Sequence, residues 1–340
     1  MRAWLFALAL ALGWVGGAAA APADGALVES RPCPPRTRTY DDWVAGQLKD
    51  ATEEAELSRK AGVTPPDVAA LRAVLPTRAE YDAELKAPAD CAFAYYGSDG
   101  LKVAAYIWKP AKLSPSARLP VIVMLRGGNR DFGKFGPDGG RRMAAFTSAG
   151  FVVIGVQYRG VDGGEGLEQF GGDDVHDVLN ALKLARALPQ ADPNNVFLHG
   201  GSRGGMMAYL ALKQGAQVNA VVALNALADL PAEAVRRPEM SEGPWRALIP
   251  DFATRRDEAL KARSAVYFID QIETPPILLL HGTSDWRADT DNSYAIARKL
   301  QAKGRPYELH VFEGDVHGLA YHWRERDRLT IAFFRRHMRR

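Results

Sequence analysis

The stretch Asn195-Val-Phe-Leu-His-Gly-Gly-Ser-Arg-Gly-Gly-Met-Met-Ala-Tyr-Leu210 decides the fold class. It begins with an apolar run typical of a buried strand and ends with an apolar run typical of a helix. Between them, Gly200, Ser202 and Gly204 form the pattern G-x-S-x-G, which lifts a serine above a parallel sheet on a sharp turn. The glycines leave space where the backbones run close together. We therefore predict Ser202 as a nucleophile; the alternative is a glycine-rich turn without chemistry.

A serine hydroxyl needs a base to take its proton and an acid to orient that base. Asp285 follows a predicted strand at 276–280, and His317 follows the last predicted strand at 307–312. The order Ser, Asp, His is that of α/β-hydrolases. We predict that Ser202 attacks a carbonyl, His317 acts as base and then acid, and Asp285 orients the imidazole.

Other histidines and acids compete for these two roles. We expect two of the histidines to be structural because of their positions in or before strands, and two lie on or near the terminal helix. The competing residues are His281, His310, His322, His337, Asp289, Asp291 and Asp315. Asp285 is preferred because it comes directly after a strand, where functional groups gather in parallel sheets.

From residue 91 onward, strand-like runs alternate with helical runs. Strands are expected at 92–96, 101–108, 119–125, 151–157, 196–199, 218–227, 276–280 and 307–312. The first two read as an antiparallel hairpin, and the others alternate with helices. This pattern predicts an α/β-hydrolase fold with a mostly parallel eight-stranded sheet and helices on both faces.

The chain is expected to divide into three parts. Residues 1–20 have a basic start, a short apolar run and an Ala-x-Ala site, typical of a signal peptide, so we expect a secreted or periplasmic protein. A retained N-terminal anchor is the alternative; no later segment is apolar enough to span a membrane. Residues 21–90 are expected to form a helical segment that either shields the site or packs on the sheet edge. Residues 91–340 form the catalytic domain.

Composition limits the classes of partner. A hydrophobic fraction of 47% and a charged fraction of 24% are ordinary for a globular protein, and a net charge of +3 does not indicate a nucleic-acid partner.

The two cysteines, Cys33 and Cys91, are an even pair in a protein expected to be exported. One disulfide would stabilise the fold by about 4 kcal/mol in the chain-entropy model, and two free thiols are the alternative.

Four motifs follow one another along the chain: Phe170-Gly-Gly-Asp-Asp-Val-His-Asp-Val-Leu179, the stretch from Asp192 to Gly205, Pro276-Ile-Leu-Leu-Leu-His-Gly-Thr-Ser-Asp285 and Asp315-Val-His-Gly318. Together they resemble the catalytic domain of the prolyl oligopeptidase family of serine peptidases. The resemblance covers roughly residues 92 to 338. It implies an α/β-hydrolase domain with Ser202, Asp285 and His317 as its triad, acting on peptides or related acyl compounds.

Two features depart from that family. The chain has no room for the β-propeller of many members, so the N-terminal helices and an insert at 228–270, with Trp245 as a candidate substrate contact, are candidates for a lid. Arg126 stands where relatives often have histidine or tyrosine before a glycine pair. We expect the oxyanion hole from the backbone N–H of Arg203 with that of Gly128 or Asn129. Arg126 either binds a substrate carboxylate or pairs with a structural acid.

Three classes of function follow from these residues. The first is a serine peptidase acting on short peptides, the second is an esterase with the same triad, and the third is a hydrolase-fold binding protein without catalysis. The fold and the triad do not fix the leaving group. No cofactor is expected and no metal site, since the histidines lack ligand spacing. The sequence does not define the oligomeric state.

Overall fold

The computed structural model describes residues 20–35, 37–86, 89–137 and 140–339. The predicted signal peptide lies almost entirely outside the described residues. Strands are numbered β1 to β9 in chain order: Leu27–Pro32, Ala89–Ser98, Leu101–Pro110, Leu119–Leu125, Val152–Val156, Ala191–Gly201, Val221–Leu224, Ile277–Gly282 and Tyr307–Phe312. Helices are numbered α1 to α12: Tyr40–Lys60, Val68–Val74, Arg78–Lys86, Gly140–Ser148, Val175–Ala187, Arg203–Lys213, Leu230–Arg236, Pro238–Met240, Arg246–Leu248, Phe252–Ala262, Asp291–Ala302 and Trp323–Arg336.

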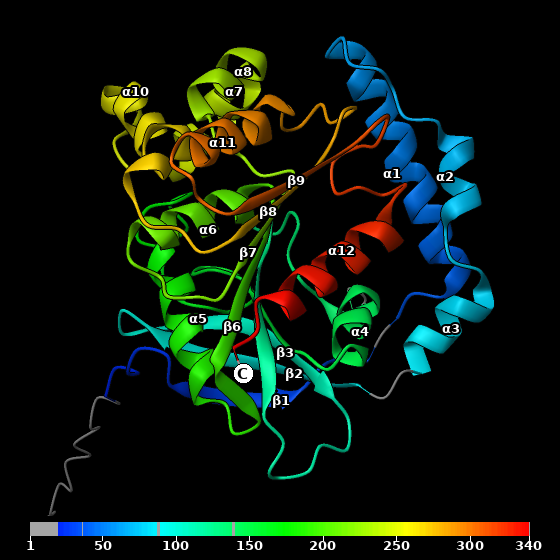
Figure 1. The fold of residues 1–340 in the computed structure, drawn as a ribbon, viewed down its shortest axis with the longest axis vertical. Helices are drawn as coiled ribbons and strands as arrows, with labels where there is room; N and C mark the ends of the chain where they lie inside the picture. Colours follow the sequence, from blue (N-terminus) through cyan, green and yellow to red (C-terminus); the bar gives the residue numbers. More distant parts are fainter. Residues whose placement is uncertain (1–19, 36, 87–88, 138–139, 340) are drawn as a thin grey trace, which may run out of the picture.

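The described strands form one sheet in the order β1-β2-β3-β5-β4-β6-β7-β8-β9 (Figure 1). The pairs β1–β2, β2–β3 and β3–β5 are antiparallel, and every pair from β5 to β9 in this order is parallel. The mostly parallel sheet is confirmed. The parallel part places the ends of β6, β7, β8 and β9 along one edge, where the predicted functional residues follow the strands.

Each central strand is buried on both faces, which explains its nearly continuous apolar sequence. In β4, Val121, Val123 and Leu125 belong to one core, which includes residues of α5, α6 and α11. Ile122 and Met124 belong to the other, which includes residues of α4 and α12. Figure 1 shows α5 and α6 on one side of the sheet and α4 and α12 on the other. The expected helices on both faces are therefore present.

The sheet differs from the prediction in two places. Strand β1 lies in the range expected to be helical and adds a ninth strand, although all six of its residues are exposed. Strand β7 has four residues rather than the ten expected at 218–227. The chain leaves the sheet at Asn225, whose φ of 45° is incompatible with an extended strand.

The helices α1 to α3 lie together on the side of the molecule where α4 and α12 cover the sheet (Figure 1). The Tyr321 hydroxyl donates to the carbonyl of Asp67 at 2.8 Å, and the Trp323 indole donates to the carbonyl of Val74 at 3.0 Å.

A disulfide joins Cys33, before α1, to Cys91 in β2. Among the residues that the structure describes, no helix combines the length and apolar character that crossing a bilayer requires.

Gly204 tests the steric basis of the central turn. A Cβ at this position would lie 2.1 Å from the carbonyl oxygen of Leu125, which belongs to β4. We expect Gly204→Ala to lower the free energy of unfolding by about 3 kcal/mol, because backbone cannot move aside as a flexible side chain can. Urea denaturation measures the change.

Gly46→Ala is the matched control. Gly46 lies inside α1 with no atom within 4 Å of the added Cβ. Alanine there should raise the free energy of unfolding by about 0.5–1 kcal/mol, since glycine disfavours a helix interior. Equal effects of the two substitutions would contradict the steric argument.

Candidate active site

Ser202 alone forms the turn between β6 and α6. Its backbone angles, φ 55° and ψ −124°, lie in a region that residues other than glycine rarely occupy. Strain of this kind persists only where the surroundings enforce it, and it gathers at functional sites. The side chain is half-buried and lines a cavity at the edge of the sheet.

Asp285 follows β8 and is buried. Its Oδ1 accepts the backbone N–H groups of Arg287 at 2.9 Å and Ala288 at 3.0 Å. Its Oδ2 lies 2.8 Å from Nδ1 of His317, which lies in the loop after β9. The backbone bonds fix the carboxylate, so that it can orient the imidazole and select which ring nitrogen faces the cavity.

Burial alone would raise the pKa of the Asp285 carboxyl group. The charge of His317 and the hydrogen bonds from His281 and His317 lower it further than burial raises it, so the pKa lies well below its usual range. The carboxylate is therefore ionised at neutral pH, as an acid that stabilises an imidazolium must be.

Asn225, directly after β7, connects the acid loop to the base loop. Its Nδ2 donates to Oδ2 of Asp285 at 2.7 Å, and its Oδ1 accepts the backbone N–H of Gly318 at 3.0 Å. The residue is buried and holds a positive φ. Sequence analysis missed Asn225, although a polar residue that interrupts an apolar run at a strand end is a signal.

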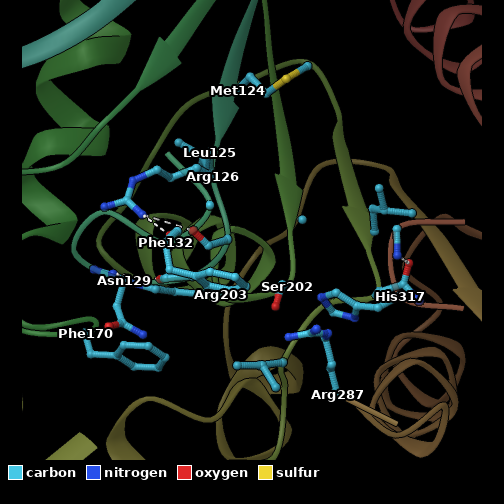
Figure 2. Close-up of a pocket in the computed structure, with 18 of the residues that line it drawn as sticks. Met124, Leu125, Arg126, Asn129, Phe132, Phe170, Ser202, Arg203, Arg287 and His317 are labelled. Atoms are coloured by element: carbon cyan, nitrogen blue, oxygen red, sulfur yellow. Dashed lines mark hydrogen bonds between the residues drawn. The ribbon is translucent and has the colours of Figure 1, made fainter. Parts of the chain in front are cut away.

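Ser202 and His317 line the same cavity, from the ends of β6 and β9 (Figure 2). Because Nδ1 of His317 is held by Asp285, Nε2 is the ring nitrogen left to serve as a base. The structure thus brings together the three residues that the strand-end pattern selects.

The competing histidines and acids have structural partners. His281 is buried, with Nδ1 at 2.7 Å from the Ser293 hydroxyl and Nε2 at 3.0 Å from the carbonyl of Ala288. Asp315 is also buried, and its carboxylate lies 2.8 Å from Nδ1 of His322. These contacts shape the loops around the site.

The expected oxyanion donors lie beside the nucleophile. Arg203 is the first residue of α6, so its backbone N–H has no acceptor within the helix. The loop of Gly128 and Asn129 lines the same cavity. At Gly127 a Cβ would lie 3.0 Å from Cβ of Ser202, so this loop passes directly beside the serine.

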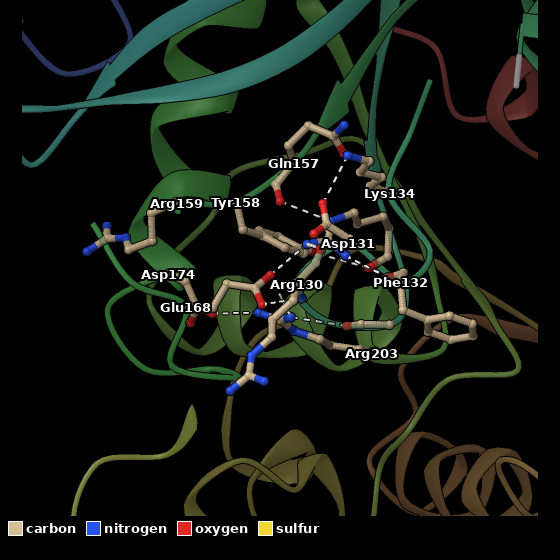
Figure 3. Close-up of polar contacts among 12 residues, drawn as sticks. Arg130, Asp131, Phe132, Lys134, Gln157, Tyr158, Arg159, Glu168, Asp174 and Arg203 are labelled. Atoms are coloured by element: carbon tan, nitrogen blue, oxygen red, sulfur yellow. Dashed lines mark hydrogen bonds and ion pairs between the residues drawn. The ribbon is translucent and has the colours of Figure 1, made fainter. Parts of the chain in front are cut away.

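A buried glutamate holds the loop of residues 126–130 against α6 (Figure 3). Oε1 of Glu168 accepts hydrogen bonds from Arg126 at 2.7 Å and from Arg203 at 3.0 Å. Its Oε2 accepts the backbone N–H of Arg130 at 2.7 Å. Arg203 also donates to Asp174 at 2.6 Å. Sequence analysis missed Glu168, which lies in a loop without regular periodicity.

Arg126 does not serve as a substrate contact, and its structural pairing is the correct alternative. Its guanidinium donates five hydrogen bonds, to Glu168 and to four backbone carbonyls, which uses every N–H that an arginine side chain has. The expectation that Trp245 contacts substrate is also wrong. Trp245 is 1% exposed and packs in the core, with its ring centroid 6.1 Å from that of Phe170.

The cavity has a volume of about 530 Å³. Its wall combines aromatic and aliphatic side chains with the candidate catalytic groups, and the insert at 228–270 contributes Arg237, Met240 and Pro244. The N-terminal helices approach through Glu54 of α1, which pairs with Arg287 of the cavity wall at 2.8 Å. Across the described residues, no group of three or more His, Cys, Asp or Glu side chains is placed to hold a metal ion.

A serine turn at the centre of a mostly parallel sheet, followed by an acid and a histidine at later strand ends, defines an α/β-hydrolase. Solved structures agree with this class. The acylaminoacyl peptidase of Pyrococcus horikoshii matches with a TM-score of 0.63 and 23% identity over 77% of this chain and 44% of that one. A puromycin-hydrolyzing peptidase of Mycobacterium tuberculosis matches with a TM-score of 0.60 and 27% identity over 70% and 38%.

The sequence profile of the prolyl oligopeptidase family matches residues 139–340, well over half of the chain, and the protein belongs to this family of serine peptidases. The uncharacterized peptidase YtmA of Bacillus subtilis is 29% identical over 65% of this chain and 84% of that protein. Acylamino-acid-releasing enzyme 1 of Oryza sativa is 28% identical over 60% of this chain. This chain spans only 28% of that plant enzyme.

Removing the charge of Glu168 should destabilise the protein strongly. Glu168→Gln leaves two buried arginines without their shared counter-charge, so we expect the free energy of unfolding to fall by about 3–5 kcal/mol. Glu53→Gln is the control. Glu53 is exposed and lies 3.8 Å from Lys49, so its loss should change the same quantity by less than about 0.5 kcal/mol. Similar values for both variants would contradict a central role of Glu168.

The lowered pKa of Asp285 predicts a pH dependence of stability. In the unfolded chain the Asp285 carboxyl group has a pKa of about 3.9, and below this pH it binds a proton in the unfolded state but not in the folded state. The stabilisation that the ionised Asp285 gives to the fold is therefore lost as pH falls. Between about pH 5 and 3, the free energy of unfolding of Asp285→Asn should therefore fall less steeply than that of wild type. Asp257→Asn, which changes an exposed carboxylate, should keep the wild-type slope. Urea denaturation at each pH measures these slopes.

Proposed function

We propose that the protein hydrolyses amide bonds of short peptides, with Ser202 as nucleophile, His317 as general base and Asp285 as the acid that orients it. The observation that carries the proposal is the 2.8 Å contact between His317 and the buried Asp285, in the cavity that Ser202 lines. Family membership supports amide hydrolysis, and the names of the rice and Pyrococcus relatives describe enzymes that release acylated amino acids.

In the proposed reaction, Nε2 of His317 takes the proton of Ser202 as Oγ forms a bond with the substrate carbonyl carbon. The negative charge develops on the carbonyl oxygen, which accepts the N–H of Arg203 and that of Gly128 or Asn129. His317 then gives its proton to the leaving amine as the C–N bond breaks. Water, deprotonated by the same histidine, hydrolyses the acyl-enzyme. Asp285 stabilises the imidazolium formed in each half of the reaction.

In this proposal, the walls of the cavity limit the length of the substrate. The insert at 228–270 acts as a lid, supported by the three cavity residues that it contributes. The helix α1 narrows the mouth through the pair of Glu54 and Arg287. Together these segments restrict the site to short chains.

An ester substrate is the second candidate, because one solved esterase matches this chain over most of the esterase's own length. The esterase Est2 of Thermogutta terrifontis, with propionate bound, matches with a TM-score of 0.54 and 26% identity, and the match covers 90% of that chain. The same triad would act on an acyl ester, where an alcohol leaves in place of the amine.

Export of the mature chain belongs to the same proposal. The pattern of residues 1–20 supports it, together with the disulfide between Cys33 and Cys91, because disulfides persist mainly in oxidising compartments.

Labelling with a fluorophosphonate probe tests the proposal. Wild type should label and Ser202→Ala should not, with kcat lowered by about a million-fold. Ser116→Ala changes an exposed serine and should label as wild type does. A panel of aminoacyl amides and short acyl esters then separates the two candidates, since turnover of esters alone would favour the esterase. Labelling that persists in Ser202→Ala would contradict the assignment.

A further inference from the structure

The wall of the cavity is rich in arginine. Five arginines belong to it, and none of the described residues that line it is Asp or Glu. The five are Arg126, Arg142, Arg203, Arg237 and Arg287. The first three have partners that are part of the fold: Arg126 and Arg203 share Glu168, and Arg142 donates to His199 at 3.0 Å. Arg237 and Arg287 are different, because each guanidinium has one nitrogen that makes no hydrogen bond within the described part of the chain.

Arg237 and Arg287 pack against the same side chain. Their guanidinium carbons lie 4.7 and 4.9 Å from the ring centroid of Trp286. Nη1 of Arg237 also donates to the backbone carbonyl of Arg287 at 2.7 Å. These contacts join the insert to the loop that carries Asp285. Figure 2 shows the Arg287 side chain reaching toward Ser202 and His317.

Each of the two guanidinium groups keeps N–H donors for a ligand. Arg237 uses Nε for Glu239 and Nη1 for a carbonyl, and Arg287 uses Nε and Nη2 for Glu54. Within the described part of the chain, Nη2 of Arg237 and Nη1 of Arg287 make no hydrogen bond. Glu239 is 59% exposed in its side chain, so solvent screens the charge that it offers to Arg237.

We propose that Arg237 and Arg287 together bind a carboxylate of the substrate next to the bond that is cleaved. Two guanidinium groups on one ring repel each other; Glu239 and Glu54 offset part of this repulsion, and an anion that contacts both guanidinium groups offsets more of it. The planar fork of arginine matches a carboxylate, and the apolar walls from Phe170 and Met240 strengthen the attraction by excluding water. This inference rests on the proposed function of the same site and names its substrate class, an acidic short peptide.

Peptides carry carboxylates in two places, on Asp and Glu side chains and at the C-terminus, and matched substrates separate them. One pair differs only in Glu or Gln before the cleaved amide bond. The other differs only in a free acid or an amide at the C-terminus of a short leaving peptide. In wild type, kcat/KM should be about tenfold higher for the anionic member of at least one pair. The preference should decrease as salt concentration rises.

Variants assign the preference to the two arginines. Arg237→Gln and Arg287→Gln should each reduce the anionic-to-neutral ratio of kcat/KM, and the double variant should bring it close to one. Arg246→Gln is the control, because Arg246 lies in the same insert, is 57% exposed in its side chain and does not line the cavity. It should keep the wild-type ratio.

A wild-type ratio at or below one for both pairs would overturn the inference, as would an unchanged ratio in the double variant. The wild-type ratio needs no variant to fold. These outcomes differ from failure of the proposed function, in which the wild-type protein would hydrolyse neither member of a pair and would not label with the fluorophosphonate probe.

Discussion

The central constraint in this structure is the lack of space where β4, β6 and α6 meet. Gly200 and Gly204 face backbone atoms at distances that a Cβ cannot occupy, and Ser202 between them is forced to a positive φ. The turn therefore places Ser202 at its tip, with the first N–H groups of α6 beside it. The proposed nucleophile, the proposed oxyanion donors and the cavity all take their positions from this crossing.

Buried charges then fix the loops around that turn. Glu168 holds the loop after β4 to the nucleophile helix through Arg126 and Arg203. Asp285, with Asn225, holds the loop after β9 to the ends of β7 and β8. Both carboxylates are buried and fully hydrogen-bonded, which makes their removal costly and their geometry rigid. Ser202 and His317 follow strands that are far apart in sequence, and these two carboxylates set their relative positions.

The parallel strands could be predicted because burial on both faces leaves long apolar runs. Ser202 and Asp285 could be selected as candidates because each comes within a few residues of such a run, and His317 because it lies in the loop after β9, which is only partly buried. Strand β1 could not, since all its residues are exposed and its sequence therefore has no apolar run. Glu168 and Asn225 could not either, because their partners come from loops that meet only in the folded chain. The role of Arg126 could be assigned only from the hydrogen bonds that its guanidinium makes in the folded protein, because the sequence indicates no more than that this arginine is buried.

The central claim is that Ser202 attacks a carbonyl whose oxygen is then held between α6 and the loop after β4. A crystal structure of the protein inactivated with a peptidyl phosphonate tests it directly. The account predicts a bond from Oγ of Ser202 to phosphorus, a phosphonyl oxygen within hydrogen-bond distance of the N–H of Arg203 and that of Gly128 or Asn129, and Nε2 of His317 beside the adduct. An adduct on another residue, or a phosphonyl oxygen directed away from these N–H groups, would contradict it.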